Sequence, residues 1–499
     1  MNKINHKFPT EILAGLTMAA VVLPQAIAFA TTLAGVPPVY GIYCAIWGVL
    51  FTAILNPSRS FMGGPNSTMA AVIGVTLLPL APQFSDAYVG YMLMLVLIAG
   101  VIQLVVYAIK PLSRAFDLIP EPVTNGVIMG IGFFLIYKSF AAFSGLPVNT
   151  QTYWQIVIAW QTFLSAMEIG NLYAIQVGMI ALASGIIARL FRSLHDWYIL
   201  VALVVGTLYS EFLISIYRNE EILIEQVGNV NLQLFAPSLP TFNQPSMPDI
   251  IAMIPGAITL AFIGLFQTVS AMKYFDRRAG EFCDARDGIR SDAVSNCLLP
   301  FISSMPTCGS YNRMYLLESL GARSKLAIVI AAFALLIFGV LLVDVLKIIP
   351  IPALAAVTML VGMNMIDWRN VSIHLRSRVE TLAFVISFLC IHIFGLFGAV
   401  VAGSLVSLAH FLWLKSHPRV WVDGNTVYVT DNVYYGSLSR IEKEISALQA
   451  EGYAEVVIDT SNVSYFDDES RRFVRLFIQR GGHVIRRRDP SKDEKDRKG

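Results

Sequence analysis

The chain contains 499 residues, of which 56% are hydrophobic and 14% charged, and its formal net charge is +2. So apolar a composition excludes an ordinary soluble domain and a disordered chain, and the balanced charge gives no support to nucleic-acid binding. The five cysteines lack the spacing of a disulfide framework or a metal site, so we expect neither a metal nor a cofactor.

Apolar runs near the ~20 residues that span a bilayer cover most of the chain, and about fourteen can be counted. They are residues 11–33, 39–55, 66–81, 90–109, 120–143, 172–190, 197–217, 250–272, 287–302, 310–320, 326–346, 352–366, 380–396 and 398–414. The third and tenth segments are short, as half-helices would be. The pattern predicts an all-α polytopic membrane protein.

The distribution of basic residues predicts the orientation. With the N-terminus inside, the outer loops at 82–89, 144–171, 218–249 and 347–351 hold only Arg218 and Lys347, whereas the inner loops hold the other loop cations. An excess of Lys and Arg marks cytoplasmic loops. We therefore expect an even number of spans with both termini cytoplasmic, in the plasma (inner) membrane.

Two apolar stretches are interrupted in the same way. Residues 63–68 read Gly-Gly-Pro-Asn-Ser-Thr, and residues 305–313 read Met-Pro-Thr-Cys-Gly-Ser-Tyr-Asn-Arg. Each places Gly, Pro and small polar residues before a short apolar run, which is how a helix begins inside the bilayer with its N–H groups facing a cavity. Paired breaks of this kind point to the substrate site of a transporter.

An internal repeat is visible in two Pro-containing motifs. Residues 118–122 (Leu-Ile-Pro-Glu-Pro) recur 230 positions later as residues 348–352 (Ile-Ile-Pro-Ile-Pro). At the same offset, Val127, Met129 and Gly132 correspond to Val357, Met359 and Gly362. With seven segments in each half, the orientation predicts a seven-plus-seven inverted repeat with the site at the repeat interface. Chance similarity between two apolar runs is the alternative.

The breaks and the first segment supply the candidate substrate-binding residues. Two half-helix N-termini contribute roughly half a positive charge each, and the arginine of the second break adds one more, so the site carries about +2 and suits an oxyanion. The candidates are Gln25, Phe29, Asn66, Ser67, Thr68, Gln267, Ser310, Tyr311, Asn312 and Arg313. No catalytic or metal-binding residue is expected.

Structural alternatives exist for several of these residues. Ser67 and Ser310 can cap their own helices. Arg313 can pair with a carboxylate such as Glu318, since an arginine at this depth needs a partner or a function. The Gln25 amide can bond to a neighbouring helix instead of a substrate.

The first segment also carries a family resemblance. Residues 24–30 (Pro-Gln-Ala-Ile-Ala-Phe-Ala) and 33–41 (Leu-Ala-Gly-Val-Pro-Pro-Val-Tyr-Gly) strongly resemble the signature of the SulP family, which includes sulfate permeases, bicarbonate transporters, pendrin and prestin. Gly64-Pro65 and residues 308–313 look like the motifs of its third and tenth segments. The resemblance covers roughly residues 10–415. It implies core and gate domains, an elevator-like motion, a homodimer, and an anion site lined by Gln25, Phe29, Gln267 and the two breaks.

One position departs from the family pattern. Family members usually carry a carboxylate where this chain has Gln267, and sodium-coupled members add a hydroxyl one turn later, where this chain has Ala271. Glutamine cannot take up a proton and is a poor replacement for a carboxylate around Na⁺. We therefore expect neither sodium nor proton coupling through this position, which favours uniport, exchange or channel-like conduction.

Past Lys415 the composition changes to that of a small α/β unit. Strands are predicted at 421–423 and 426–429, as a hairpin, and at 455–459 and 484–485; helices are predicted at 438–448 and 469–480. The order resembles a STAS domain, whose central strand and loop match residues 457–467. We expect a cytoplasmic N-terminus at 1–10, a transport domain at 11–415, a short STAS-like cytoplasmic domain at 418–488 and a disordered tail at 489–499.

These observations favour a secondary transporter of small anions that works by an elevator-type mechanism, with the anion between half-helices three and ten. Sulfate is favoured, and bicarbonate, chloride and dicarboxylates stay open. An uncoupled channel or motor-like protein and a nucleobase symporter of the same fold are the alternatives. An enzyme is not expected, because the spans lack paired carboxylates, metal sets and nucleophile–base motifs.

Overall fold

The computed structural model divides the chain into two compact units, Met1–Gly403 and Ser404–Gly499. It describes residues 8–59, 61–115, 121–146, 170–191, 194–217, 224–228, 246–279, 284–322, 324–341, 343–366, 378–416, 420–433, 435–453, 455–479 and 481–485. The expected disordered tail at 489–499 lies outside these residues.

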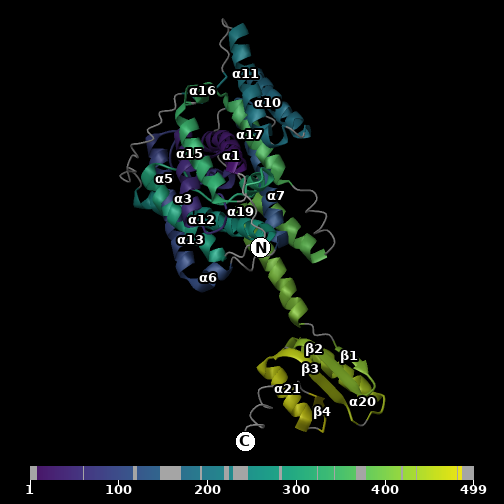
Figure 1. Ribbon diagram of the computed structural model, residues 1–499. Helices are drawn as coiled ribbons and strands as arrows, with labels where there is room; N and C mark the ends of the chain where they lie inside the picture. The colour runs from purple at the N-terminus through teal and green to yellow at the C-terminus, as the bar shows by residue number, and fades with distance from the viewer. Residues whose placement is uncertain are drawn as a thin grey trace. The chain divides into compact units, whose positions relative to one another are not determined.

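In the first half of the larger unit, the regular elements of the described part are helices (Figure 1). Its elements are α1 (Phe8–Ala28), η1 (Phe29–Ala34), α2 (Pro38–Tyr43), η2 (Cys44–Gly48), α3 (Val49–Leu55), α4 (Ser67–Leu77), α5 (Asp86–Ala108), α6 (Lys110–Ala115), α7 (Glu121–Lys138), α8 (Phe140–Phe143), α10 (Leu172–Leu190), η4 (His195–Trp197) and α11 (Tyr198–Ile216). The segments η1 and η2 are π-helical, a geometry that is frequent at functional sites.

The second half repeats the pattern of long helices interrupted by a short one. Its elements are α12 (Met247–Ala279), α13 (Ala285–Leu298), η5 (Leu299–Ile302), α14 (Tyr311–Ser319), α15 (Lys325–Leu341), α16 (Val343–Lys347), α17 (Ile351–Met365) and α19 (Arg378–Ser416). Among the described residues, seven helices are long and apolar enough to cross a membrane, and four shorter apolar helices accompany them. The predicted helical membrane class is confirmed, although α12 extends beyond its predicted end at residue 272.

The element α19 reverses its direction within its length. In a straight α-helix, residues 387 and 403 would lie about 24 Å apart. However, a Cβ on Gly403 would lie 1.9 Å from Ser387 Oγ, and a Cβ on Gly398 would lie 2.6 Å from the Cβ of Phe394. The chain must therefore turn back between Ser387 and Gly403, which agrees with the two segments predicted at 380–396 and 398–414.

The two repeats meet where α7 packs against α17. A Cβ on Gly132 would lie 2.6 Å from the carbonyl oxygen of Gly362, and a Cβ on Gly362 would lie 2.6 Å from the carbonyl oxygen of Gly132. Such a reciprocal contact is what a two-fold relation between corresponding residues requires. It supports the offset of 230 as a true repeat, although residues 118–120 of the first motif lie outside the described part.

We expect Gly132→Ala and Gly362→Ala to destabilise the protein by similar amounts, about 1–3 kcal/mol each, because each methyl group would press on backbone that cannot rotate away. Thermal unfolding of the purified protein in detergent measures the effect. Gly288→Ala is the control, since its Cβ would meet only side-chain atoms, at 3.1 Å or more. Unchanged melting temperatures for both α7 and α17 variants would contradict the close approach.

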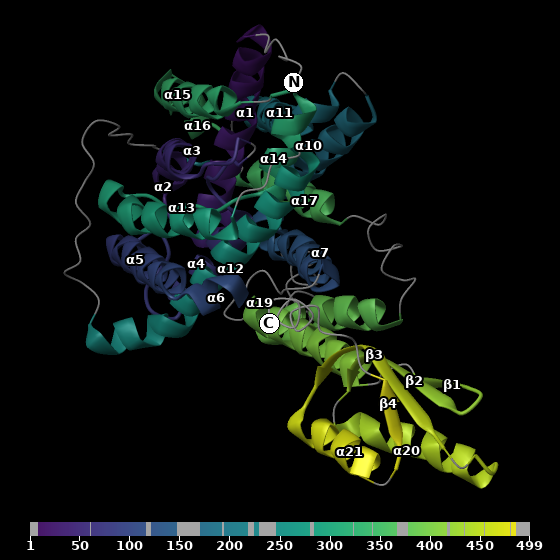
Figure 2. The same cartoon turned by 60° about the horizontal axis from the view of Figure 1, so that its bottom comes forward.

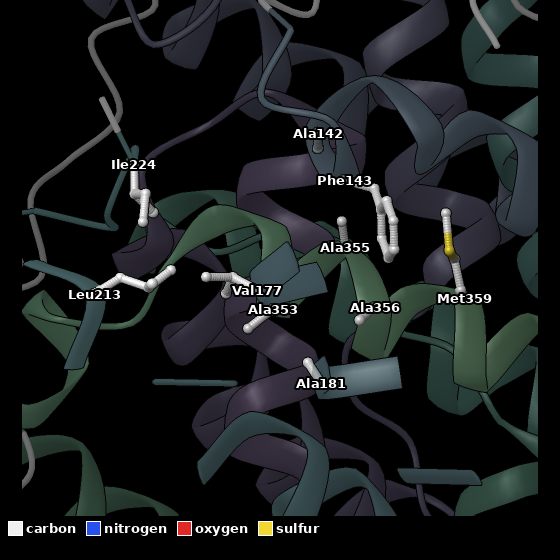
Figure 3. Packing of buried hydrophobic residues seen from close by; sticks show 10 residues of the cluster. All are labelled: Ala142, Phe143, Val177, Ala181, Leu213, Ile224, Ala353, Ala355, Ala356 and Met359. Atoms are coloured by element: carbon white, nitrogen blue, oxygen red, sulfur yellow. The ribbon is translucent and has the colours of Figure 1, made fainter. Parts of the chain in front are cut away.

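A cluster of small apolar residues joins α8, α10, α11 and α17 (Figure 3). Ala181, Ala353, Ala355 and Ala356 are all buried in it. Small side chains let membrane helices approach closely, so that backbone and methyl contacts stabilise the packing. The larger Phe143 and Met359 fill the remaining space beside the alanines.

The C-terminal unit is an α/β structure, as predicted. Its elements are β1 (Val420–Asp423), β2 (Thr426–Val433), α20 (Tyr435–Ala450), β3 (Val457–Phe466), α21 (Asp468–Gln479) and β4 (His483–Ile485). The sheet order is β1-β2-β3-β4, with β1 antiparallel to β2 and the other pairs parallel. Both crossovers step the same way across the sheet, which places α20 and α21 on one face (Figure 2).

Candidate functional site

The two sequence breaks lie side by side. Pro65 and Thr307 form an isolated antiparallel β-bridge. The Gly64 N–H donates to Thr307 Oγ1 at 2.6 Å, and the Cys308 N–H donates to the Gly64 carbonyl at 3.4 Å. The bridge satisfies backbone groups that would otherwise be unpaired in the membrane. It also brings the first turns of α4 and α14 toward each other.

The start of α4 is organised by the side chain of Asn66. Its Oδ1 accepts from the N–H groups of Thr68 at 2.9 Å and Met69 at 3.2 Å, so Asn66 is the N-cap. The alternative that Ser67 caps this helix is therefore wrong. The Ser67 hydroxyl is buried and accepts none of these cap bonds.

Gln267 on α12 connects to this cap. Its Oε1 accepts from Asn66 Nδ2 at 2.6 Å, and its Nε2 donates to Thr68 Oγ1 at 3.1 Å. The glutamine thus ties α12 to the first turn of α4 without bringing a charge. Both amides need their present orientation for this network.

The start of α14 lacks a side-chain cap. Ser310 occupies the N-cap position, yet its hydroxyl accepts no cap hydrogen bond. The capping alternative for Ser310 is therefore wrong as well, and its hydroxyl remains available to another partner. Asn312 is half-buried in this first turn, and Tyr311 packs against Phe275.

Arg313 binds backbone carbonyls of both breaks. Its guanidinium donates to the carbonyl oxygens of Pro65, of Gly64 at 3.2 Å and of Cys308 at 2.9 Å. These carbonyls, and not the Glu318 carboxylate, receive its hydrogen bonds. Because Arg313 is only 4% exposed, water screens its charge poorly, and the charge acts strongly on the site.

A buried carboxylate that sequence analysis missed lies behind the second break. Asp292 on α13 accepts from the Thr268 hydroxyl, which in turn accepts from the Gly309 N–H at 2.8 Å. Asp292 and Arg313 interact electrostatically. The charge of about +2 expected from the breaks and Arg313 therefore falls by one whenever Asp292 is ionised.

The side-chain amide of Asn296 bonds to both backbone groups of Thr307, as a neighbouring β-strand would. Its Oδ1 accepts from the Thr307 N–H at 2.8 Å, and its Nδ2 donates to the Thr307 carbonyl at 3.0 Å and to Gln103 Oε1 at 3.0 Å. Asp292 and Asn296 are four residues apart, so they share one face of α13. The many other polar residues of α13 hide this pair in the sequence, so the spacing of four was the one signal that could have revealed it.

Gln25 and Phe29 lie at the junction of α1 and η1. The segment η1 packs against α4, and α1 packs against α14, so both of these helices have neighbours on the α1–η1 segment. Gln25 is 7% exposed and makes no hydrogen bond with any residue that the structure describes. A buried, unengaged amide of this kind is available to a substrate. In the described part of the chain, no cluster of His, Cys, Asp and Glu could hold a metal ion.

The sequence matches the family model described as "Sulfate permease family" over residues 8–390. A "Probable sulfate transporter" of Mycobacterium tuberculosis (strain CDC 1551 / Oshkosh) is 26% identical over 425 residues, which cover 82% of this chain and 71% of that protein. "Prestin" of Danio rerio is 22% identical, covering 93% of this chain and 65% of its own.

Solved structures share the fold. The structure titled "The overall structure of SLC26A9" superposes with a TM-score of 0.80 at 16% identity, covering 98% of this chain and 86% of that one. The transmembrane domain of a cyanobacterium bicarbonate transporter, BicA, gives a TM-score of 0.65 at 19% identity, covering 80% of this chain and 98% of that one.

Proposed function

The chain belongs to the sulfate permease family, and from this premise we propose that it is a secondary transporter of a small oxyanion, with sulfate as the first candidate. Members of this family are transporters and not enzymes. The chain is accordingly an integral membrane anion transporter. The substrate, the site and the mechanism are the proposal.

The observation that carries the proposal is the pairing of the two helix starts. The start of α14, which has no side-chain cap, the positive end of α4 and the buried Arg313 charge converge where the Pro65–Thr307 bridge joins the breaks. Helix N-termini bind sulfate and phosphate by this chemistry. The proposed lining residues are Gln25, Phe29, Asn66, Ser67, Thr68, Gln267, Ser310, Tyr311, Asn312 and Arg313.

Within this set the roles differ. Ser67, Ser310 and Gln25 have side chains that the helix caps do not use, so they are the proposed direct ligands. Asn66, Thr68 and Gln267 bond to one another, and Arg313 bonds to carbonyls, so these are positioning residues. Arg313 still attracts the anion through its charge.

Sulfate is favoured by the charge of the site and by the sulfate transporters among the relatives. Two opposed helix starts and a buried guanidinium compensate a divalent anion better than a monovalent one. Bicarbonate, chloride and dicarboxylates are the competing substrates.

The proposed mechanism is an elevator motion of a core against a gate. The helices of the breaks, α4 and α14, belong with α12, α13 and α5 in one packed set, whereas α7, α10, α11 and α17 form another. We further propose a homodimer, cytoplasmic termini in the plasma membrane, and a STAS-like role for the β1–β4 unit in regulation or dimer contact.

Solid-supported-membrane electrophysiology on the purified protein in liposomes tests the function. We expect a transient current on pulsing sulfate without a sodium gradient, and weaker responses to bicarbonate, chloride and dicarboxylates. A response to uracil alone would move the chain to the nucleobase symporters. Sustained sulfate current that follows an applied voltage without saturation would indicate a channel.

Ser310→Ala tests the proposed ligand role. Loss of a hydrogen bond to a charged substrate costs about 1.5–3 kcal/mol, so we expect the apparent KM for sulfate to rise roughly tenfold or more. Because this hydroxyl caps nothing, the melting temperature should not change. Ser319→Ala, at the other end of α14, removes a hydroxyl bonded to the Leu316 carbonyl and is the control. An unchanged KM in Ser310→Ala would exclude this hydroxyl from the site.

A further inference from the structure

We propose that Asp292 is a proton-binding site and that its protonation controls anion binding between α4 and α14. The inference rests on the transport function proposed above and adds a coupling ion to it. It also provides the carboxyl group that position 267 lacks, from a different helix.

Asp292 is buried, and only one of its two carboxylate oxygens accepts a hydrogen bond from a residue that the structure describes. Its side chain is 0% exposed on α13, which lies beside α5 and α12 (Figure 2). Oδ2 accepts from the Thr268 hydroxyl, but Oδ1 has no hydrogen-bond partner among the described residues. An orphaned carboxylate oxygen is costly to bury, and a functional reason is the usual explanation.

One hydroxyl group separates this carboxyl from the substrate site. Thr268 follows Gln267 in the chain, and its Oγ1 accepts from the Gly309 N–H at 2.8 Å while it donates to Asp292. Gly309 directly precedes Ser310, the N-cap residue of α14. A proton on Oδ1 leaves each of these hydrogen bonds intact, because that oxygen takes part in none of them.

The ionisable groups around Asp292 are few. The second break brings Cys308, and α14 brings Arg313, both of which interact electrostatically with it. From α12 and α5 come the neutral Thr268 and, through Asn296, Gln103. The elements α3 and η5 contain no ionisable residue, and Lys110 of α6 is exposed. Arg313 is the buried positive charge that interacts electrostatically with Asp292.

The electrostatic consequence is coupling between the proton and the anion. When Asp292 is ionised, its charge offsets that of Arg313 and repels an anion. When a proton neutralises it, Arg313 and the two helix starts attract the anion unopposed. Binding free energies are reciprocal, so a bound anion must favour protonation by the same factor by which the proton favours the anion.

The test uses the full chain in liposomes with pyranine inside, pulsed with radiolabelled sulfate over a range of pH. We expect sulfate affinity to rise tenfold or more between about pH 8 and about pH 5.5, and uptake to acidify the lumen. Asp292→Asn should lose both effects and keep sulfate exchange, because the isosteric amide can still accept from Thr268. Asp276→Asn, at a buried carboxylate that accepts from Ser58, should behave as wild type.

The outcomes separate this inference from the proposed function. Sulfate transport by the wild type without luminal acidification would overturn the proton site and leave the transporter intact, and so would an Asp292→Asn variant with the full pH response. Absence of transport for every anion would overturn the proposed function itself. If Asp292→Asn fails to fold, the acidification by wild type and a shifted pH response in Asp292→Glu decide the question.

Discussion

Replacing Arg313 with alanine is expected to reduce sulfate uptake to near background. The guanidinium donates to carbonyl oxygens on both sides of the Pro65–Thr307 bridge. Its removal leaves the buried carbonyls of Pro65 and Cys308 without this donor and removes a positive charge, at a cost of about 1–3 kcal/mol for each unsatisfied group. Sulfate affinity, measured by titration calorimetry on the purified protein, should fall at least tenfold.

Arg286→Ala is the matched control. That guanidinium also donates to a backbone carbonyl, of Tyr107 at 3.0 Å, and lies over the Tyr107 ring, but it takes no part in the bridge. It should therefore change stability without weakening sulfate binding. Wild-type sulfate affinity in Arg313→Ala would show that Arg313 has no role in binding. Equal losses of affinity in the two variants would show that Arg313 contributes only to the stability of the fold.

Gln267→Glu is expected to make transport depend on acid or on sodium beyond any dependence of the wild type. Gln267 accepts from Asn66 and donates to Thr68, and a carboxylate can keep both contacts if the Thr68 hydroxyl turns to donate. The substitution then places a negative charge at the first turn of α4, where the anion must bind. Sulfate flux at neutral pH should fall at least tenfold, since roughly one unit charge is added in a poorly screened place.

Recovery of the sulfate flux distinguishes an effect of the added negative charge in Gln267→Glu from a general disruption of the structure. Protonation of the new carboxyl, or Na⁺ bound beside it, should restore transport, and each can be measured as uptake against pH or sodium concentration. Gln176→Glu is the control, because that glutamine lies on α10, outside the site, and accepts from Tyr209 of α11. If the sulfate flux of Gln267→Glu is reduced and depends on neither pH nor Na⁺, a carboxyl group at position 267 does not couple transport to either ion.

Much of the architecture could be predicted from the sequence because hydropathy and turn residues act locally. The break at 63–68 contains Gly and Pro where a helix cannot continue, and α4 begins at Ser67, two residues after Pro65. The offset that pairs Gly132 with Gly362 predicted a repeat, the count of seven segments in each half predicted that it is inverted, and the two residues meet reciprocally. The residue types and their spacing along the chain were sufficient to predict the start of α4 and the repeat.

The hydrogen-bond partners could not be predicted in the same way. Arg313 was expected to face the anion or a carboxylate, and instead it binds carbonyls that are available only because the two breaks pair. Ser67 and Asn66 are both good caps, and sequence alone does not decide which one takes the role. Asp292 became a candidate only when the fold placed Thr268 against it.

The location of a bound oxyanion can be determined with selenate, whose selenium scatters anomalously. Crystals or oriented samples of the protein soaked in selenate should show selenium between the first turns of α4 and α14, within hydrogen-bonding reach of the Ser310 hydroxyl and of the N–H groups in the first turn of α14. Arg313→Ala should remove that selenium, and Arg286→Ala should retain it. Selenium bound elsewhere, in a protein that transports selenate, would contradict an anion site between the two helix starts.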